Sequence, residues 1–140
     1  MRRHQVLVHP YPENIEIFID AMMVEQVLQN VLDNASKYTP PGTLIEVRYR
    51  TDASVGFSCE VHDHGAGLPP EKLERVFDKY ARLHKKDSQI AGTGLGLAIS
   101  KAMMEAQGGS ITAGNHPEGG AVFTLRLPQW RKTDMTRYLE

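Results

Sequence analysis

The feature that most constrains the fold is a change of apolar period at Asp20. Over residues 14–20 isoleucine occupies every second position, which is typical of a half-buried strand. After Asp20, which suits a helix N-cap, apolar residues recur every three or four positions and predict a helix over 21–37. A helix with a single apolar face must bury it against another layer. The residues of this apolar face, which form a stripe along the helix, are Val24, Val27, Leu28, Val31, Leu32 and Ala35.

Hairpin-forming strands follow this helix rather than a regular strand–helix alternation. Strands are predicted at 44–50, 56–62, 110–115 and 121–127, a short helical piece near 71–78, a loop at 81–92, and a second helix at about 95–107. The second helix should stop at Gly108-Gly109. This order predicts an α/β fold, a two-layer sandwich of a mixed, mostly antiparallel sheet packed on helices. We expect a single domain over 1–140, with its core at about 14–128 and short terminal extensions.

Composition places the chain among ordinary globular proteins. Of its 140 residues, 41% are hydrophobic and 24% charged, and the net charge of -1 gives no general attraction to nucleic acid. The single cysteine, Cys59, cannot form an internal disulfide and fits an apolar strand face, so we interpret it as a core residue of a cytoplasmic domain. No apolar run approaches the roughly 18 residues that span a bilayer, and we expect no direct membrane contact.

A second, polar stripe runs along the first predicted helix. Its members fall on one helical face at spacings of three and four, and they are Gln26, Asn30, Asp33, Asn34 and Lys37. Amide oxygens can coordinate Mg²⁺ and a lysine can meet a phosphate. Taken alone, the stripe is better interpreted as a solvated surface.

Two glycine-bearing segments are candidate ligand loops. Asp63 ends an apolar strand face, where a carboxylate needs a partner such as the exocyclic amine of adenine, and Gly65 and Gly67 would let the backbone approach the base. An ordinary turn beginning with aspartate is the alternative. The segment 92–97 precedes a helix but matches neither the dinucleotide-binding pattern nor a Walker A loop. It is weak evidence by itself.

The histidines raise a metal-site hypothesis. His62 and His64 flank Asp63 in the alternate strand register, but no third ligand lies at a recognised spacing. We therefore interpret both as ordinary surface residues at this stage.

Four motifs together resemble the histidine kinases of the GHKL ATPase superfamily. Residues 30–38 resemble the N box, 63–67 the G1 box, 76–80 the F box and 92–96 the G2 box, in the family's order. The resemblance covers about 14–128 and implies the Bergerat fold, with Mg²⁺ and ATP as cofactors. Within the superfamily, 115–123 and 77–80 resemble the Kdp-type potassium-responsive sensor kinases.

The resemblance also implies roles for individual positions. Asn34 would ligate Mg²⁺, Lys37 and Arg82 would complete the catalytic set, and Asp63 would bind the adenine amine. Phe77 would anchor a lid over 81–92. The implied cofactor-binding set is Asn30, Asn34, Lys37, Tyr38, Asp63, Gly65, Gly67, Leu68, Phe77, Gly92, Thr93, Gly94, Leu95 and Gly96. Two departures from the family pattern, Tyr80 for phenylalanine and His64 for asparagine, affect Arg82 and the turn after Asp63.

The resemblance implies that the chain supplies the γ-phosphoryl group of ATP to a histidine on a separate dimerisation domain, with a response regulator downstream and an inner-membrane sensor as parent. The phosphoacceptor signature is absent, since His4 and His9 lack its context, so the isolated chain should not autophosphorylate. Two alternatives stay open: an anti-sigma-type serine kinase of the same superfamily, and a non-catalytic ATP-gated interaction module.

Overall fold

The computed structural model describes residues 4–11, 14–54, 56–79, 95–134 and 136. Its helices and strands follow the chain in the order β1 (Gln5–Val8), β2 (Ile15–Ile17), α1 (Ala21–Lys37), β3 (Leu44–Asp52), β4 (Gly56–Asp63), the 3-10 helix η1 (Pro70–Lys72), α2 (Gly96–Ala106), β5 (Ser110–Asn115), β6 (Ala121–Leu127) and β7 (Trp130–Lys132). No helix within these ranges is long and apolar enough to cross a membrane.

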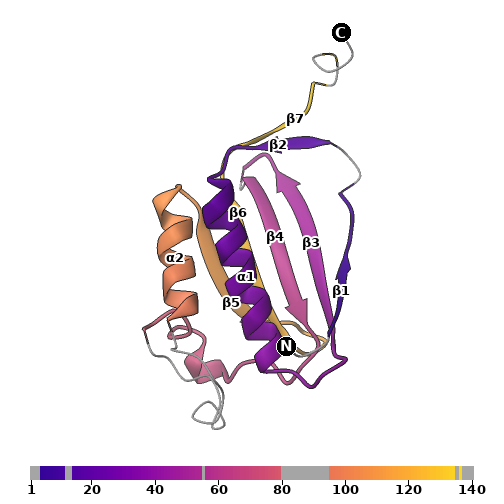
Figure 1. Cartoon of the computed structure of the whole chain (residues 1–140), viewed down its shortest axis with the longest axis vertical. Helices are drawn as coiled ribbons and strands as arrows, with labels where there is room; N and C mark the ends of the chain where they lie inside the picture. Colours follow the sequence, from indigo (N-terminus) through magenta and orange to yellow (C-terminus); the bar gives the residue numbers. More distant parts are fainter. Residues whose placement is uncertain (1–3, 12–13, 55, 80–94, 135, 137–140) are drawn as a thin grey trace.

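The fold is a two-layer α/β sandwich. Five strands form one sheet in the order β1-β3-β4-β6-β5, in which only the β1–β3 pair is parallel. Helices α1 and α2 lie together on one face of this sheet, and no helix of the described residues covers its other face, here called the uncovered face (Figure 1). A separate two-stranded sheet joins β2 and β7 beyond the end of the main sheet. The predicted mixed, mostly antiparallel sheet packed on helices is therefore confirmed.

Helix α1 begins where the apolar period changes. Asp20 is its N-cap, and its Oδ1 accepts a hydrogen bond from the backbone N–H of Met23 at 3.1 Å. The predicted stripe faces the sheet, and Val27 and Val31 are completely buried. Burying each valine side chain contributes on the order of 1.5–3 kcal/mol to folding, so the stripe stabilises the packing of the helix against the sheet.

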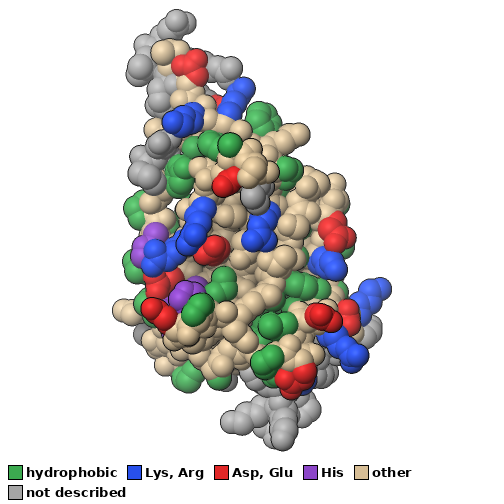
Figure 2. Space-filling view, turned by 180° about the vertical axis from the view of Figure 1, so that it is seen from behind, with side chains coloured by type: hydrophobic (Ala, Val, Ile, Leu, Met, Phe, Trp, Pro, Cys, Tyr) green, Lys and Arg blue, Asp and Glu red, His purple; other side chains and the backbone are tan. Residues whose placement is uncertain are grey.

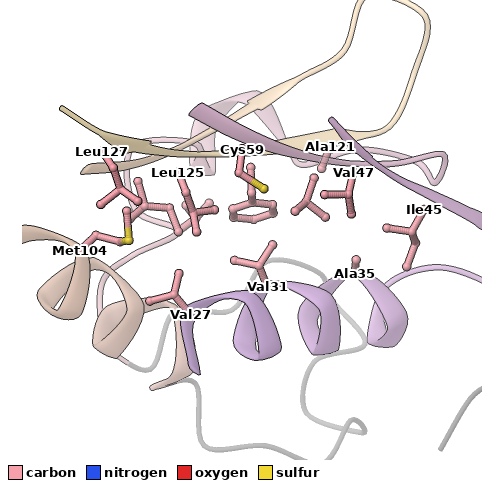
Figure 3. Packing of buried hydrophobic residues seen from close by; sticks show 14 of the residues in the cluster. Val27, Val31, Ala35, Ile45, Val47, Cys59, Met104, Ala121, Leu125 and Leu127 are labelled. Carbon is pink, nitrogen blue, oxygen red and sulfur yellow. The ribbon is translucent and has the colours of Figure 1, made fainter. Parts of the chain in front are cut away.

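The core lies between the helices and the inward-facing residues of β3, β4 and β6 (Figure 3). The pleat places Phe57, Cys59, Val61 and Asp63 on the covered face, as the period of two predicts. Cys59 is 4% exposed, which confirms it as a core residue, and this burial raises the pKa of its thiol to about 12.

Some elements differ from the sequence predictions. The first predicted strand is shorter, at Ile15–Ile17. The helical piece expected near 71–78 is a 3-10 turn at Pro70–Lys72 followed by further turns. Strands β1 and β7 had no predicted counterpart. Helix α2 ends as expected, with Gly108 at a φ of 77°. The predicted loop at 81–92 lies outside the described residues.

Candidate functional site

Asp63 ends β4 as a carboxylate on the covered, helix-facing side of the sheet. It is only 7% exposed, and its Oδ1 accepts hydrogen bonds from the backbone N–H groups of Gly65 at 3.0 Å and Ala121 at 3.1 Å. Oδ2 takes part in neither bond. The backbone therefore fixes the orientation of the carboxylate while one oxygen is left to accept from another donor, as recognition of an amine requires.

The turn after Asp63 has no room for side chains at its glycines. A Cβ on Gly65 would lie 2.7 Å from Cγ2 of Thr39 and 3.3 Å from Oδ1 of Asp63. Gly67 has a φ of 79°, a conformation that side chains disfavour. The contact with Thr39 also brings the residue that follows α1 against this turn. The structure thus joins the predicted G1 segment to the end of the predicted N box.

An amide clamp that the sequence analysis missed holds the same turn. Asn115, at the end of β5, accepts from the backbone N–H of Leu68 through Oδ1 and donates to the Leu68 carbonyl through Nδ2, both at 2.8 Å. Leu68 itself is buried. The clamp fastens the backbone just beyond Gly67 to the sheet. Its only sequence signal is an asparagine at a strand end before a tight turn.

Gly120 supports Asp63 from the hairpin between β5 and β6. Its φ is 89°, and a Cβ at this position would lie 1.9 Å from the carbonyl oxygen of Asp63. No side chain fits there without moving the backbone. The carboxylate, its turn and this hairpin therefore form one closely packed unit.

The last turn of α1 carries the residues predicted to meet Mg²⁺ and phosphate. Asn34 and Lys37 are half-buried there, and the carbonyl of Asn34 accepts from the backbone N–H of Tyr38 at 3.2 Å. Tyr38 packs against the core cluster. The end of α1 is thereby held beside the Asp63 turn through the adjoining Thr39. Amide and lysine side chains at this place suit a metal-bound polyphosphate.

Asn30 is bonded to protein groups rather than standing open on the polar stripe. Its Nδ2 donates to the carbonyl of Gly96 and to Oγ of Ser100, both at 3.1 Å, and its Oδ1 accepts from Gln26. Ser100 is completely buried and also bonds the Gly96 carbonyl at 2.8 Å. This network fixes the start of α2, and with it the end of the predicted G2 box, to the middle of α1.

Phe77, which is predicted to anchor the lid, packs against the core cluster. Its ring makes an edge-to-face contact with Phe123, with centroids 6.3 Å apart, and the preceding Val76 is 2% exposed. Leu95 precedes α2 and accepts from the backbone N–H of Ile99. Four other predicted site residues lie outside the described residues, and they are Arg82, Gly92, Thr93 and Gly94.

The donors and the free space of this site can be compared with what Mg²⁺ and ATP need. A carboxylate with one oxygen engaged by backbone, a turn whose glycines exclude side chains, and a neighbouring amide and lysine suit an adenine nucleotide with Mg²⁺. The described part of the predicted site therefore fits this ligand.

Comparison with known proteins agrees with this arrangement. The family model described as histidine kinase-, DNA gyrase B-, and HSP90-like ATPase matches residues 19–131. The sensor protein KdpD of Escherichia coli (strain K12) is 40% identical over 124 residues, which cover 89% of this chain and 14% of that protein. The sensor histidine kinase WalK of Bacillus subtilis (strain 168) is 35% identical over 131 residues, or 90% of this chain and 21% of that protein.

Solved structures show the same fold. A mycobacterial sensor histidine kinase, MprB, superposes with a TM-score of 0.73 at 28% identity, covering 94% of this chain and 83% of that one. Full-length ShkA in complex with AMPPNP superposes with a TM-score of 0.70 at 26% identity, covering 94% of this chain and 26% of that one. The chain thus spans a small part of the length of the curated relatives that it matches.

Proposed function

The chain belongs to the family of histidine kinase-, DNA gyrase B-, and HSP90-like ATPases, and on that premise we propose that it is the ATP-binding catalytic unit of a sensor histidine kinase. In this role it transfers the γ-phosphoryl group of ATP to a histidine on a separate dimerisation domain. The observation that carries the proposal is the buried Asp63 carboxylate, fixed by backbone at Oδ1 inside a turn that excludes side chains.

We assign adenine recognition to Asp63. Its Oδ2 accepts from the exocyclic amine of adenine, whereas guanine presents a carbonyl oxygen at the same place and would face the carboxylate with repulsion. Gly65 and Gly67 shape the pocket floor, and the Asn115 clamp on Leu68 keeps that floor in position. The site therefore selects ATP over GTP before any chemistry begins.

We assign binding of the ATP phosphates and of Mg²⁺ to the last turn of α1. Asn34 is the protein ligand for Mg²⁺ and Lys37 faces the phosphates, while Asn30 positions the start of α2 through Gly96. Bound Mg²⁺ supplies neutralisation of charge on the phosphate oxygens. The chain's own contribution is positioning, and Arg82, in the segment outside the described residues, remains the predicted contact to the terminal phosphate.

The proposed role implies two protein partners. A histidine-containing dimerisation domain receives the phosphoryl group, and a response regulator acts downstream. The names of the matched sensor proteins support a sensor kinase as the parent protein. We propose that this parent is an inner-membrane sensor, with this domain on its cytoplasmic side. The same names favour histidine as the acceptor over the serine of anti-sigma-type kinases.

The metal assignment is tested by calorimetric titration with AMPPNP, with and without Mg²⁺, on the wild type and on Asn34→Ala. We expect Mg²⁺ to strengthen binding to the wild type and to have no effect on the variant, while Mg²⁺-free binding stays the same in both. Equal strengthening by Mg²⁺ in the variant would remove Asn34 from the metal site.

Phosphoryl transfer is tested with γ-labelled ATP. The chain alone should stay unlabelled, and a histidine-containing dimerisation domain from a related sensor kinase, added or fused to it, should acquire an acid-labile, base-stable label. Label on the isolated chain would contradict the proposal. Label on an added protein with the acid stability of phosphoserine would favour the serine-kinase alternative.

A further inference from the structure

A cluster of imidazoles around a carboxylate lies on the uncovered face of the sheet, opposite the helices. The β3–β4 register places Glu46 directly beside His62, and His64 follows two residues later, so both histidines point away from the side that Asp63 occupies. One potential ligand atom from each of Glu46, His62 and His64 lies within 4.8 Å of the others. Figure 2 shows histidine side chains beside acidic ones on this face.

One ring nitrogen of His62 is engaged by the backbone, which leaves the other to act as a ligand. It is 9% exposed, so it is not the surface residue that the sequence analysis expected, and its Nε2 lies 2.9 Å from the carbonyl oxygen of Gly119. Because a carbonyl only accepts, Nε2 carries the hydrogen and Nδ1 of the neutral ring carries the lone pair. Histidines that bind metal ions usually donate the hydrogen of their other ring nitrogen to a carbonyl or carboxylate oxygen in this way, which fixes the tautomer.

Glu46 supplies the carboxylate of the cluster. Its Oε1 accepts from Nε2 of His64 at 2.8 Å, and its Oε2 accepts from Nε2 of His9 at 2.6 Å and Nη2 of Arg48 at 2.9 Å. The hydrogen bonds from His9 and His64 lower the pKa of this carboxyl to about 2. The group is therefore ionised and already directed at imidazole nitrogens.

We propose that Glu46, His62 and His64 bind a divalent transition metal ion of the zinc class. Two imidazole nitrogens with one carboxylate oxygen form a ligand set that Zn²⁺ takes, with water at the fourth position, whereas Mg²⁺ prefers oxygen ligands alone. The third ligand escaped the sequence analysis because it comes from the neighbouring strand, and not from a local spacing.

The site needs only a small adjustment to close on the ion. Ligands of a tetrahedral zinc ion with bonds of about 2.1 Å lie about 3.4 Å apart, against separations here of up to 4.8 Å. The side chain of His64 is 38% exposed and can rotate inward. The ion replaces the hydrogen bond between His64 and Glu46, and the proton on Nε2 of His64 moves to Nδ1.

The position of the cluster gives such an ion a structural consequence. His62 and His64 immediately flank Asp63 in the chain, and Gly119 adjoins Gly120, which packs on the Asp63 carbonyl. An ion held on the uncovered face therefore fixes the strand end that carries the predicted adenine ligand on the covered face.

The test is titration of the nucleotide-free, magnesium-free chain with Zn²⁺, in competition with a chromogenic chelator. His64→Gln and His116→Gln are a matched pair, because the two rings lie on His62 with centroids 4.3 and 4.2 Å away, but His116 is outside the ligand set. We expect one tight site in the wild type, weakened at least about tenfold in His64→Gln and unchanged in His116→Gln.

Equal affinity of His64→Gln and wild type would overturn the proposal, as would an equal loss in His116→Gln. Glu46→Gln provides a second check, since it keeps the side-chain shape and removes the charge, and it too should weaken Zn²⁺ binding. Circular dichroism confirms that each variant is folded. Since no nucleotide is present, failure here leaves the proposed kinase function untouched, and failure of nucleotide binding leaves this site untouched.

Discussion

The two faces of the sheet at the end of β4 are built on different principles. On the covered face, Asp63 is held by backbone groups, and glycines leave no space around it. On the uncovered face, His62 bonds one backbone carbonyl and stacks with His64 and His116, and the half-exposed His64 is held by the side chain of Glu46. Backbone contacts cannot move aside, whereas exposed side chains can. Substitutions on the covered face should therefore lower the free energy of unfolding much more than substitutions on the uncovered face.

The largest effect is expected from Gly120→Ala. The added methyl group would lie 1.9 Å from the Asp63 carbonyl oxygen, so the hairpin and the strand end must separate. We expect a loss of about 4 kcal/mol or more in the free energy of unfolding, measured by urea denaturation.

Gly119→Ala is the matched control for this substitution. Gly119 also has a positive φ, of 105°, but a Cβ there would meet nothing within 4 Å. Only backbone strain should appear, at about 1–3 kcal/mol. Equal losses in the two variants would mean that strain, and not close approach to Asp63, explains the need for glycine.

The next largest loss of unfolding free energy is expected in the core, between the covered face and the helices. Met104 on α2 is completely buried, whereas Met22 on α1 is 82% exposed. Met104→Ala should lower the free energy of unfolding by about 2–5 kcal/mol because it leaves a cavity, and Met22→Ala should change it by less than about 0.5 kcal/mol. Similar urea midpoints for the two variants would contradict the described packing of α2.

Asn115→Ala tests the clamp on the turn. Two hydrogen bonds to the Leu68 backbone are lost, which should cost about 1–3 kcal/mol of unfolding free energy and weaken ADP binding in calorimetry. Thr112→Ala, on the same strand, removes only an exposed contact with Arg126 and should leave ADP binding unchanged. If ADP binding does not distinguish the two variants, the clamp does not shape the pocket.

The smallest change in the free energy of unfolding is expected on the uncovered face. Nε of Arg50 lies 3.7 Å from Oε1 of Glu60, and both side chains are partly exposed, at 67% and 27%. Glu60→Gln should therefore change the free energy of unfolding by less than about 1 kcal/mol. A larger loss by urea denaturation would show that the uncovered face is as rigid as the covered one.

The elements that the sequence predicted well are those with a strong local period. Helix α1, strand β4 and the hairpin of β5 and β6 each carry their own apolar pattern, and Asp63 falls on the inward face by simple alternation. Strands β1 and β7 have no such signal, because each is short and exists through pairing with a distant segment, β3 and β2 respectively.

The candidate site, like the fold, could be predicted only in part from the sequence. The motif residues around Asp63 could be identified from the sequence, but their supports could not. Asn115 clamps a backbone 47 residues away, and Asn30 bonds Gly96 across 66 residues. Glu46 joins the histidine cluster only through strand register. Such contacts depend on the topology of the sheet, which local spacing does not encode.

The most direct test of the account is the affinity for ADP of Asp63→Asn compared with Glu60→Gln, by calorimetry. Both variants neutralise one carboxylate on β4, on opposite faces of the sheet. An asparagine at 63 can still accept from Gly65 and Ala121 through Oδ1, but then turns its amide N–H groups towards the adenine amine. We predict a loss of at least about tenfold, or 1.4 kcal/mol, for Asp63→Asn and none for Glu60→Gln. Wild-type affinity for ADP in a folded Asp63→Asn variant would contradict the assignment of this carboxylate as the adenine ligand.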